Sequence, residues 1–236
     1  MDMLMQNDSK GKQKLVIICS GGLGDVIRQA AVHQDKYEFI GFCDDKYQEM
    51  KQEERYFTAP IKQVELLRNE KDIFFFIAVG DCWIRKALYA RLNLEDNRYA
   101  TIIHPAAFVD TNVILGHGVG IMPQAIVHNG TSIGNHTIVN SASVIEHKNQ
   151  IADFVSISPN TTLCGFVTVD SGTFIGVGST VVQCLTIGSD TIIGAGSLVL
   201  KNIPPRSIAY GSPVVVVGSS DKYRLEIEDK KKGEKE

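Results

Sequence analysis

A six-residue repeat is the feature that most restricts how this chain can fold. Cut into sixes from Val109 to Pro204, the sequence gives 16 hexads, and the first residue of each is aliphatic, without one inserted residue. The fifth position is small or aliphatic almost throughout, with Asn149 as the exception. A fixed short period is typical of a β-solenoid, in which each hexad supplies a short strand whose first side chain points inward. Because three hexads would make one triangular coil, the repeat predicts about five coils around one aliphatic column.

A β-sandwich of short strands is the competing interpretation of these hexads. Sandwich turns would scatter the period, so the unbroken register favours the solenoid. The hexads do not determine the handedness of the coils, although parallel crossovers are normally right-handed. Composition separates the repeat from the rest of the chain, because residues 109–204 hold only seven of the 51 charged residues and three of the 18 aromatic ones. This difference predicts two domains.

The sequence before the repeat alternates apolar runs with helical patterns, which predicts a small parallel α/β sheet. Ligands of such sheets bind at the carboxyl ends of the strands. The expected boundaries are a disordered segment at 1–13, an α/β domain at 14–104, a β-helix at 105–218 and a charged flexible tail at 219–236. The expected strands are 15–19, 39–43, 73–79 and 99–103. Three helices are expected, of which the first follows the glycine turn after residue 19 and ends near 34, and the others span 61–69 and 83–94.

The composition of the whole chain excludes several classes of partner. A net charge of −3 argues against nucleic acid or an anionic membrane surface as the main partner. No stretch approaches the roughly 18 apolar residues of a spanning helix, and Met1 to Lys14 lack the apolar core of a signal peptide. The five cysteines are scattered and never form a C-x-x-C pair, which predicts a reduced, cytoplasmic protein without disulfides or a zinc motif.

Two loops of the α/β segment are candidate ligand sites. The first expected strand is followed by a glycine turn, Ser20 to Gly24, where the backbone could approach a phosphate at a helix N-terminus. A tight packing turn explains these glycines equally well. Asp44 and Asp45 follow the second strand and could contact a ribose or sugar hydroxyl, with a solvated loop as the alternative.

Several stretches together resemble one family of enzymes. The chain is similar to the hexapeptide-repeat sialic acid O-acetyltransferases and nucleotide-amino-sugar N-acetyltransferases of the bacillosamine type. The resemblance implies a Rossmann-like α/β domain followed by a left-handed parallel β-helix, a homotrimer, and acetyl transfer from acetyl-CoA to a nucleotide-linked amino sugar in surface glycan biosynthesis. The matching stretches are FCDDK at 42–46, FIAVGDCWIRKALYARL at 76–92, IIHPAAFV at 102–109, VNSASVIEH at 139–147, ISPNTTLCG at 157–165 and IPPRSIAYGSP at 203–213.

The resemblance also implies the roles of individual residues. His147 matches the general base that takes a proton from the acceptor. Gly165, eighteen residues later, matches the backbone N–H donor to the thioester oxyanion, and Asn140 matches a site-lining asparagine. Arg85 matches a family arginine, and we expect it to be solvated on a helix surface. The implied nucleotide-sugar contacts are Gly21, Gly22, Leu23, Asp44, Asp45 and Gly80, and the implied acetyl-CoA contacts are Ser156, Val177 and Ala195.

Three positions depart from the pattern of the family. Lys148 follows the expected base where an acidic residue is usual, and an ammonium disfavours the imidazolium that a carboxylate would stabilise. Its side chain could instead point to solvent or toward a CoA phosphate. Ser156 and Leu23 each replace a histidine. Two alternatives to N-acetylation therefore stay open, namely O-acetylation of a sialic acid or another sugar, and a catalytically impaired module that binds a nucleotide sugar or CoA.

Three other histidines of the repeat raise the possibility of a metal site. His117, His128 and His136 also lie in the hexads, and a β-helical carbonic anhydrase uses three histidines on zinc. The close H-x4-H pair of that family is absent, so the sequence predicts no metal.

Overall fold

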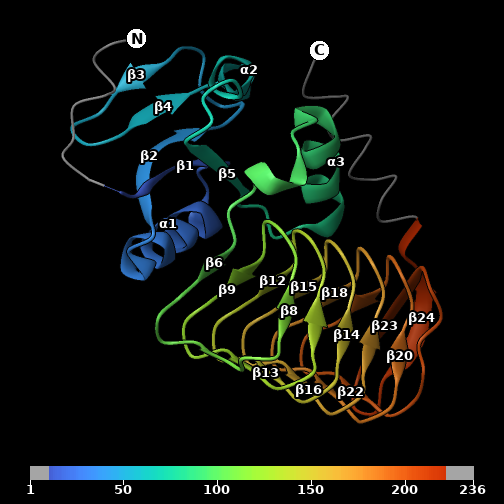
Figure 1. Ribbon diagram of the computed structural model, residues 1–236. Coiled ribbons are helices and arrows are strands. Elements are labelled where there is room, and N and C mark those ends of the chain that lie inside the picture. Colours follow the sequence, from blue (N-terminus) through green and yellow to red (C-terminus); the bar gives the residue numbers. More distant parts are fainter. Residues whose placement is uncertain (1–10, 222–236) are drawn as a thin grey trace.

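The computed structural model describes residues 11–221 and consists of an α/β domain that sits on a three-sided solenoid (Figure 1). The segments predicted to be flexible, 1–13 and 219–236, lie mostly outside the described residues. Of their described part, Gln13 opens the first strand and Ser219 closes the last one.

The α/β domain is built on one five-stranded sheet. The strand order is β3-β4-β2-β1-β5, and all neighbours are parallel except β3 and β4. Parallel strands alternating with helices place the loops after β1, β2 and β5 at one edge of this sheet. The elements are β1 (Gln13–Ile18), α1 (Gly22–Gln34), β2 (Tyr37–Cys43), β3 (Lys51–Gln52), β4 (Phe57–Ala59), a 3₁₀ turn (Ile61–Gln63), α2 (Val64–Leu67), β5 (Ile73–Ile77), α3 (Cys82–Leu92) and a 3₁₀ turn (Asp96–Arg98).

Two expectations for this domain were wrong. Residues 99–103 do not form a fourth strand of the sheet, since Tyr99 makes one isolated bridge to Phe75 and β6 (Ile102–Ile103) pairs with the solenoid strand β9. Ile103 stands six residues before Val109, in the phase of the repeat, so the repeat extends one hexad back from Val109 and the solenoid begins just before the predicted boundary at 105. The helix expected at 61–69 is a 3₁₀ turn followed by the single turn of α2, and the β3–β4 pair was not predicted.

The solenoid has three sheets of parallel strands, in which residue i pairs with residue i + 18 from β6 to β22, and the antiparallel strand β24 ends the third sheet. The first face contains β7, β10, β13, β16, β19 and β22, the second contains β8, β11, β14, β17 and β20, and the third contains β6, β9, β12, β15, β18, β21, β23 and β24. The bounds are β7 (Phe108–Val109), β8 (Ile114–Leu115), β9 (Gly120–Ile121), β10 (Ile126–Val127), β11 (Ser132–Ile133), β12 (Ile138–Val139), β13 (Val144–Ile145), β14 (Gln150–Ile151), β15 (Ser156–Ile157), β16 (Thr162–Leu163), β17 (Thr168–Val169), β18 (Phe174–Ile175), β19 (Thr180–Val181), β20 (Thr186–Ile187), β21 (Ile192–Ile193), β22 (Leu198–Val199), β23 (Ser207–Tyr210) and β24 (Val215–Ser219).

Three corners join these faces. We call the turns after first-face strands, such as 146–149 and 164–167, the open corner. The turns after second-face strands, such as 134–137 and 152–155, form the covered corner. The turns after third-face strands, such as 140–143 and 176–179, form the third corner.

The interior of the solenoid explains the hexad pattern. First-position side chains from Ile121 to Val199 are at most 3% exposed and form the aliphatic column. Fifth-position hydroxyls join successive coils, as when Thr137 Oγ1 donates to Ala152 O at 2.8 Å and accepts from Val155 N at 3.0 Å. Asn149 does the same, because its Oδ1 accepts from Val167 N at 2.9 Å. The one exception at the fifth position is therefore a polar bridge and not a break in the repeat.

Most hexads turn through a left-handed residue. The fourth position has φ between +53° and +75° in each hexad from Gly118 to Gly196. Glycine adopts this conformation freely, whereas a residue with a Cβ loses about 1–2 kcal/mol. His136, Phe154 and Phe166 occupy such positions, so contacts of these large side chains must offset the cost.

The α/β domain covers the start of the third face. Ile102 and Met122 are buried in one cluster with Ile27 and Phe76 of the domain. A Cβ at Gly120 would come within 3.1 Å of the Phe76 ring, so the sheet and the domain are in direct contact. The open corner is the vertex opposite the third face, and Figure 1 shows β13 and β16 on the side of the solenoid away from the domain.

Candidate functional site

The predicted glycine loop forms an open helix N-terminus. Gly21 is the N-cap of α1 and provides no side-chain cap, and a Cβ at Gly21 or Gly22 would meet no atom within 4 Å. Gly24 serves packing instead, since its Cβ would lie 2.5 Å from Cys19 O. Leu23 is half-buried and packs against the domain core. Unused N–H groups at a helix start favour an anion, so Gly21 and Gly22 can receive a phosphate.

Asp44 holds the glycine loop from the neighbouring strand. Its Oδ2 accepts from Ser20 N at 2.8 Å and from Ser20 Oγ at 3.0 Å, and its Oδ1 accepts from Lys46 N at 3.1 Å. Partial burial opposes ionisation, but these hydrogen bonds outweigh it and lower the pKa of Asp44. The carboxylate thus shapes the edge at which a ligand would bind.

Asp45 is engaged by a residue that the sequence did not indicate. Arg91 of α3 donates to both carboxylate oxygens of Asp45, at 2.6 and 3.0 Å. The two residues lie 46 positions apart, and no local pattern marks the pair. The ion pair places a guanidinium beside the loops that follow β1 and β2.

Arg85 is buried, so its predicted solvation on a helix surface was wrong. The residue is 1% exposed, and its guanidinium donates to His136 O at 2.7 Å, Gly80 O at 3.2 Å and Phe154 O at 3.0 Å. It also donates to Val79 O, Val155 O and Ser156 Oγ. Burial lowers the pKa of Arg85. Since α3 buries Cys82, Arg85, Leu88 and Leu92, the apolar stripe of this helix could have revealed it.

Ser156 completes this network between the two domains. Its hydroxyl accepts from Arg85 at 2.9 Å and donates to Gly80 O at 2.7 Å, and the residue is 5% exposed. Gly80, a predicted nucleotide-sugar contact, and Ser156, a predicted acetyl-CoA contact, are therefore bonded to each other. Both lie at the junction of the α/β domain and the third face.

A cluster of aromatic rings fills the covered corner beside Arg85. His136 stacks on Phe154 with ring centroids 5.1 Å apart, and Tyr89 and Tyr99 pack on the same imidazole. Burial lowers the pKa of His136 to about 4, and the charge of Arg85 acts in the same direction. The covered corner therefore packs the solenoid against the α/β domain, with His136 buried in the contact.

His147 lies at the open corner and contacts the next coil. The residue is exposed, and a Cβ at Gly165 would come within 2.6 Å of its Cε1 atom. Cys164 N and Phe166 N donate to backbone carbonyls, whereas Gly165 N donates in no backbone bond of the described residues. An imidazole and an N–H without a backbone acceptor therefore lie on adjacent coils, an arrangement that acyl transfer could use. Lys148 is exposed, and its Nζ lies 5.1 Å from the centre of the Phe166 ring.

One chain does not bring all the predicted residues together. His147, Lys148 and Gly165 lie at the open corner, while Asn140, Val177 and Ala195 lie at the third corner, one strand away around the coil. The third corner is accessible, since Val177 is 47% exposed. The open corner is the one opposite the face that carries the α/β domain. The predicted base and the glycine loop of the same chain are therefore on opposite sides of the solenoid.

The histidines do not gather around a metal. His136 is enclosed by aromatic rings, and within residues 11–221 no group of three or more His, Cys, Asp or Glu side chains could hold an ion. Nor does that part of the chain contain a helix long and apolar enough to cross a membrane. The five cysteines, all within the described residues, form no disulfide bond.

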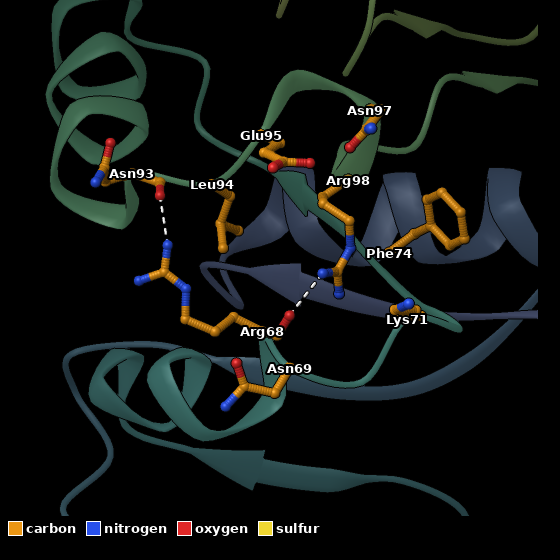
Figure 2. A pocket seen from close by; sticks show the side chains of 9 residues that line it. All are labelled: Arg68, Asn69, Lys71, Phe74, Asn93, Leu94, Glu95, Asn97 and Arg98. Atoms are coloured by element: carbon orange, nitrogen blue, oxygen red, sulfur yellow. Dashed lines mark hydrogen bonds between the residues drawn. The ribbon is translucent and has the colours of Figure 1, made fainter.

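A cavity of about 590 Å³ lies near the start of β5, at the end of the α/β sheet opposite the glycine loop (Figure 2). Arg98 crosses it and donates to Arg68 O, Glu70 O and Ile73 O, which fixes the loop before β5. The remaining lining comes from Asn69, Lys71, Phe74, Asn93, Leu94, Glu95 and Asn97. None of the predicted site residues lines this cavity.

Comparisons with known proteins agree with the sequence resemblance. Residues 14–92 match the family described as the PglD N-terminal domain. UDP-N-acetylbacillosamine N-acetyltransferase of Bacillus subtilis (strain 168) is 38% identical over 111 residues, which are 47% of this chain and 51% of that protein. The chain thus spans about half the length of the curated relatives it matches.

Solved structures are similar over most of the chain. PerB from Caulobacter crescentus, in complex with CoA and GDP-perosamine, has a TM-score of 0.79 at 27% identity, over 87% of this chain and 97% of that chain. The acetyltransferase domain of PglB from Neisseria gonorrhoeae FA1090, in complex with acetyl coenzyme A, has a TM-score of 0.76 at 29% identity, over 88% and 100%. The predicted fold class, a Rossmann-like α/β domain before a left-handed parallel β-helix, is confirmed. Residues 14–92 match the PglD N-terminal domain family, and the predicted resemblance of the chain to nucleotide-amino-sugar N-acetyltransferases is confirmed.

Proposed function

We propose that this chain is an acetyl-CoA-dependent N-acetyltransferase that acts on a nucleotide-linked amino sugar for surface glycan biosynthesis. The observation that supports it most is the contact of His147 with Gly165, whose N–H is left out of the backbone ladder. The relatives are named for N-acetylation of UDP- and GDP-linked amino sugars, and PerB was solved with CoA and GDP-perosamine. Nucleotide-sugar binding is assigned to the α/β domain and acetyl transfer to the solenoid.

The reaction follows from these positions. The acceptor amine attacks the thioester carbonyl of acetyl-CoA, a C–N bond forms, and the C–S bond breaks. His147 takes the proton of the attacking amine and can return it to the leaving CoA thiolate. The Gly165 N–H donates to the carbonyl oxygen as negative charge develops there. In this proposal Asn140, Val177 and Ala195 line the acetyl-CoA site, while Gly21, Gly22, Asp44 and Asp45 border the nucleotide sugar.

The active unit is proposed to be a homotrimer in the cytoplasm. The base and the glycine loop of one chain lie on opposite sides of the solenoid, so a second copy must bring them together. The first face supports such contact because its outward residues Phe108, Ile126 and Val144 are apolar, and Phe108 is 54% exposed. Cyclic association would cover this face and place the open corner of one chain beside its neighbour.

Release of free thiol from acetyl-CoA tests the activity. We expect release with at least one member of a panel of UDP- and GDP-linked amino sugars, and its loss in His147→Asn. Release with a sialic acid or a sugar hydroxyl alone would support O-acetylation instead. Tight binding of CoA or a nucleotide sugar without turnover on any acceptor would identify a non-catalytic module.

A further inference from the structure

The imidazole of His147 lacks a polar partner that would orient it. Within residues 11–221 the ring makes no hydrogen bond, and the residue that follows it is Lys148 and not an acid. A general base usually depends on a hydrogen bond to a second group, which fixes the ring and its tautomer. The contacts of the His147 ring are instead with the next coil.

The next coil supplies that contact through an aromatic side chain. The Phe166 and His147 rings have centroids 5.3 Å apart and planes at 87°, an edge-to-face arrangement. Such pairs contribute about 0.5–1.5 kcal/mol beyond the area they bury. Because Gly165 has no side chain, the imidazole also lies directly on the backbone of the same turn.

The same Phe166 ring holds the unusual lysine. The Lys148 ammonium lies 5.1 Å from the ring centre, while its Cγ atom lies 3.0 Å from where a Cβ of Gly130 would be. The aliphatic part of the Lys148 side chain therefore lies against Gly130 of the preceding coil, and its ammonium lies on Phe166 of the following coil. An ammonium on an aromatic face is attracted by the ring quadrupole, which fixes where the charge sits.

Phe166 is far more exposed than Phe154, which occupies the same hexad position at the covered corner. Phe166 has φ +62° and is 50% exposed, so it bears the cost of a left-handed residue without being enclosed. Phe154 has φ +59° at the covered corner, but there it is 7% exposed and packs on His136 and Tyr89. The contacts of Phe166 with His147 and Lys148 are the counterparts of that packing.

We propose that Phe166 is a positioning residue, which orients the imidazole of His147 with its edge-on contact and keeps the Lys148 ammonium on its face. It takes over by packing the role of the carboxylate that the family resemblance leads one to expect after the base. The consequence for catalysis rests on the proposed function, whereas the effect on the imidazole does not.

A chemical probe tests the orientation without any activity. Carbethoxylation by diethyl pyrocarbonate, followed by peptide mass spectrometry, reports how accessible each histidine ring is. We expect the rate at His147 to rise severalfold in Phe166→Ala and to stay at the wild-type value in Phe166→Tyr. His117 and His128 in the same digest serve as internal controls, and Leu66→Ala removes an exposed apolar side chain from α2, far from His147. Equal rates at His147 in the wild type and Phe166→Ala would overturn the proposal.

Kinetics then test the consequence for acetyl transfer. In Phe166→Ala we expect kcat to fall about tenfold, as for a displaced catalytic group, with little change in KM for either substrate. Phe166→Tyr should retain kcat, and Phe166→Leu, which is apolar but not aromatic, should lose most of it. Should Phe166→Ala fail to fold, the Tyr and Leu variants decide the matter. An active wild type whose kcat is unchanged in Phe166→Leu contradicts the positioning role, while an inactive wild type contradicts only the proposed function.

Discussion

The covered and open corners are built from the same turn but serve different ends. Each has residues eighteen positions apart in left-handed conformation, His136 with Phe154 and Lys148 with Phe166. At the covered corner, a cation from α3 reaches into the turn and binds backbone carbonyls. At the open corner, the cation belongs to the turn itself and the neighbouring histidine is accessible. The backbone of the hexad turn is thus the same at both corners. The side chains around it differ, and they make the covered corner a packed contact between the domains and leave the open corner accessible to a ligand.

Replacing the exposed histidine should have the largest effect on activity and almost none on stability. His147→Asn removes the proposed base, and we expect kcat to fall by about 10²–10⁴. The thermal midpoint should stay close to the wild-type value, because the side chain is exposed. Thiol-release kinetics and circular dichroism check the two expectations. A variant that keeps most of its turnover would remove the open corner from the chemistry.

Replacing the buried arginine should do the reverse. Arg85→Gln leaves carbonyls of Gly80, His136 and Phe154 without a charged donor, and we expect unfolding free energy to fall by about 3–5 kcal/mol. Arg91→Gln in the same helix is the matched control. Its ion pair with Asp45 is exposed, so its loss should cost less than about 1 kcal/mol. Urea unfolding of both variants measures the difference, and equal losses would contradict the structural role of the covered corner.

The buried histidine should make this corner sensitive to acid. The pKa of His136 is about 4 in the folded chain and about 6.5 when unfolded, so the unfolded state binds the proton more readily. The stabilising contribution is complete above pH 6.5 and declines as pH falls toward 4, by up to about 3 kcal/mol. His136→Phe should flatten this part of the stability profile. An unchanged slope between pH 6.5 and 4 in that variant would show that other groups cause it.

The smallest effect is expected at Lys148. Because its ammonium lies on the Phe166 ring, neutralising it in Lys148→Met should change kcat by less than about threefold. Lys148→Glu restores the charge sign that the family resemblance implies and serves as the comparison. A tenfold change in the Met variant would mean that the ammonium acts on the reacting groups directly.

The features of the fold that follow from the six-residue period were predicted from the sequence. First-position residues such as Ile145 and Val199 recur inside the solenoid at a fixed spacing, and this spacing predicted the solenoid and the column of His147 with Gly165. The sequence pattern assigned Ile102 and Ile103 to the wrong sheet, because a short apolar strand can pair with the α/β sheet or with the solenoid. The register of the repeat, extended backward by one hexad, would have corrected this.

The parts that could not be predicted depend on contacts between distant segments. Arg85 binds carbonyls more than fifty residues away, and Asp45 meets Arg91 across the top of the sheet. Neither pairing leaves a local trace, although the position of Arg85 on the buried stripe of α3 hints at burial. That His147, the proposed base, lies away from its own α/β domain follows only from the order of the three faces.

The central claim is that His147 of one chain and the glycine loop of its neighbour form one site, and mixing two inactive variants tests it most directly. His147→Asn lacks the base, and Gly22→Glu puts a carboxylate at the open N-terminus of α1, where a Cβ meets no neighbouring atom. If the base of one chain serves the glycine loop of its neighbour, each mixed ring of three has one intact site, and unfolding and refolding the two together should restore about a quarter of wild-type activity. Mixed oligomers that form without any gain over the separate variants would contradict the account.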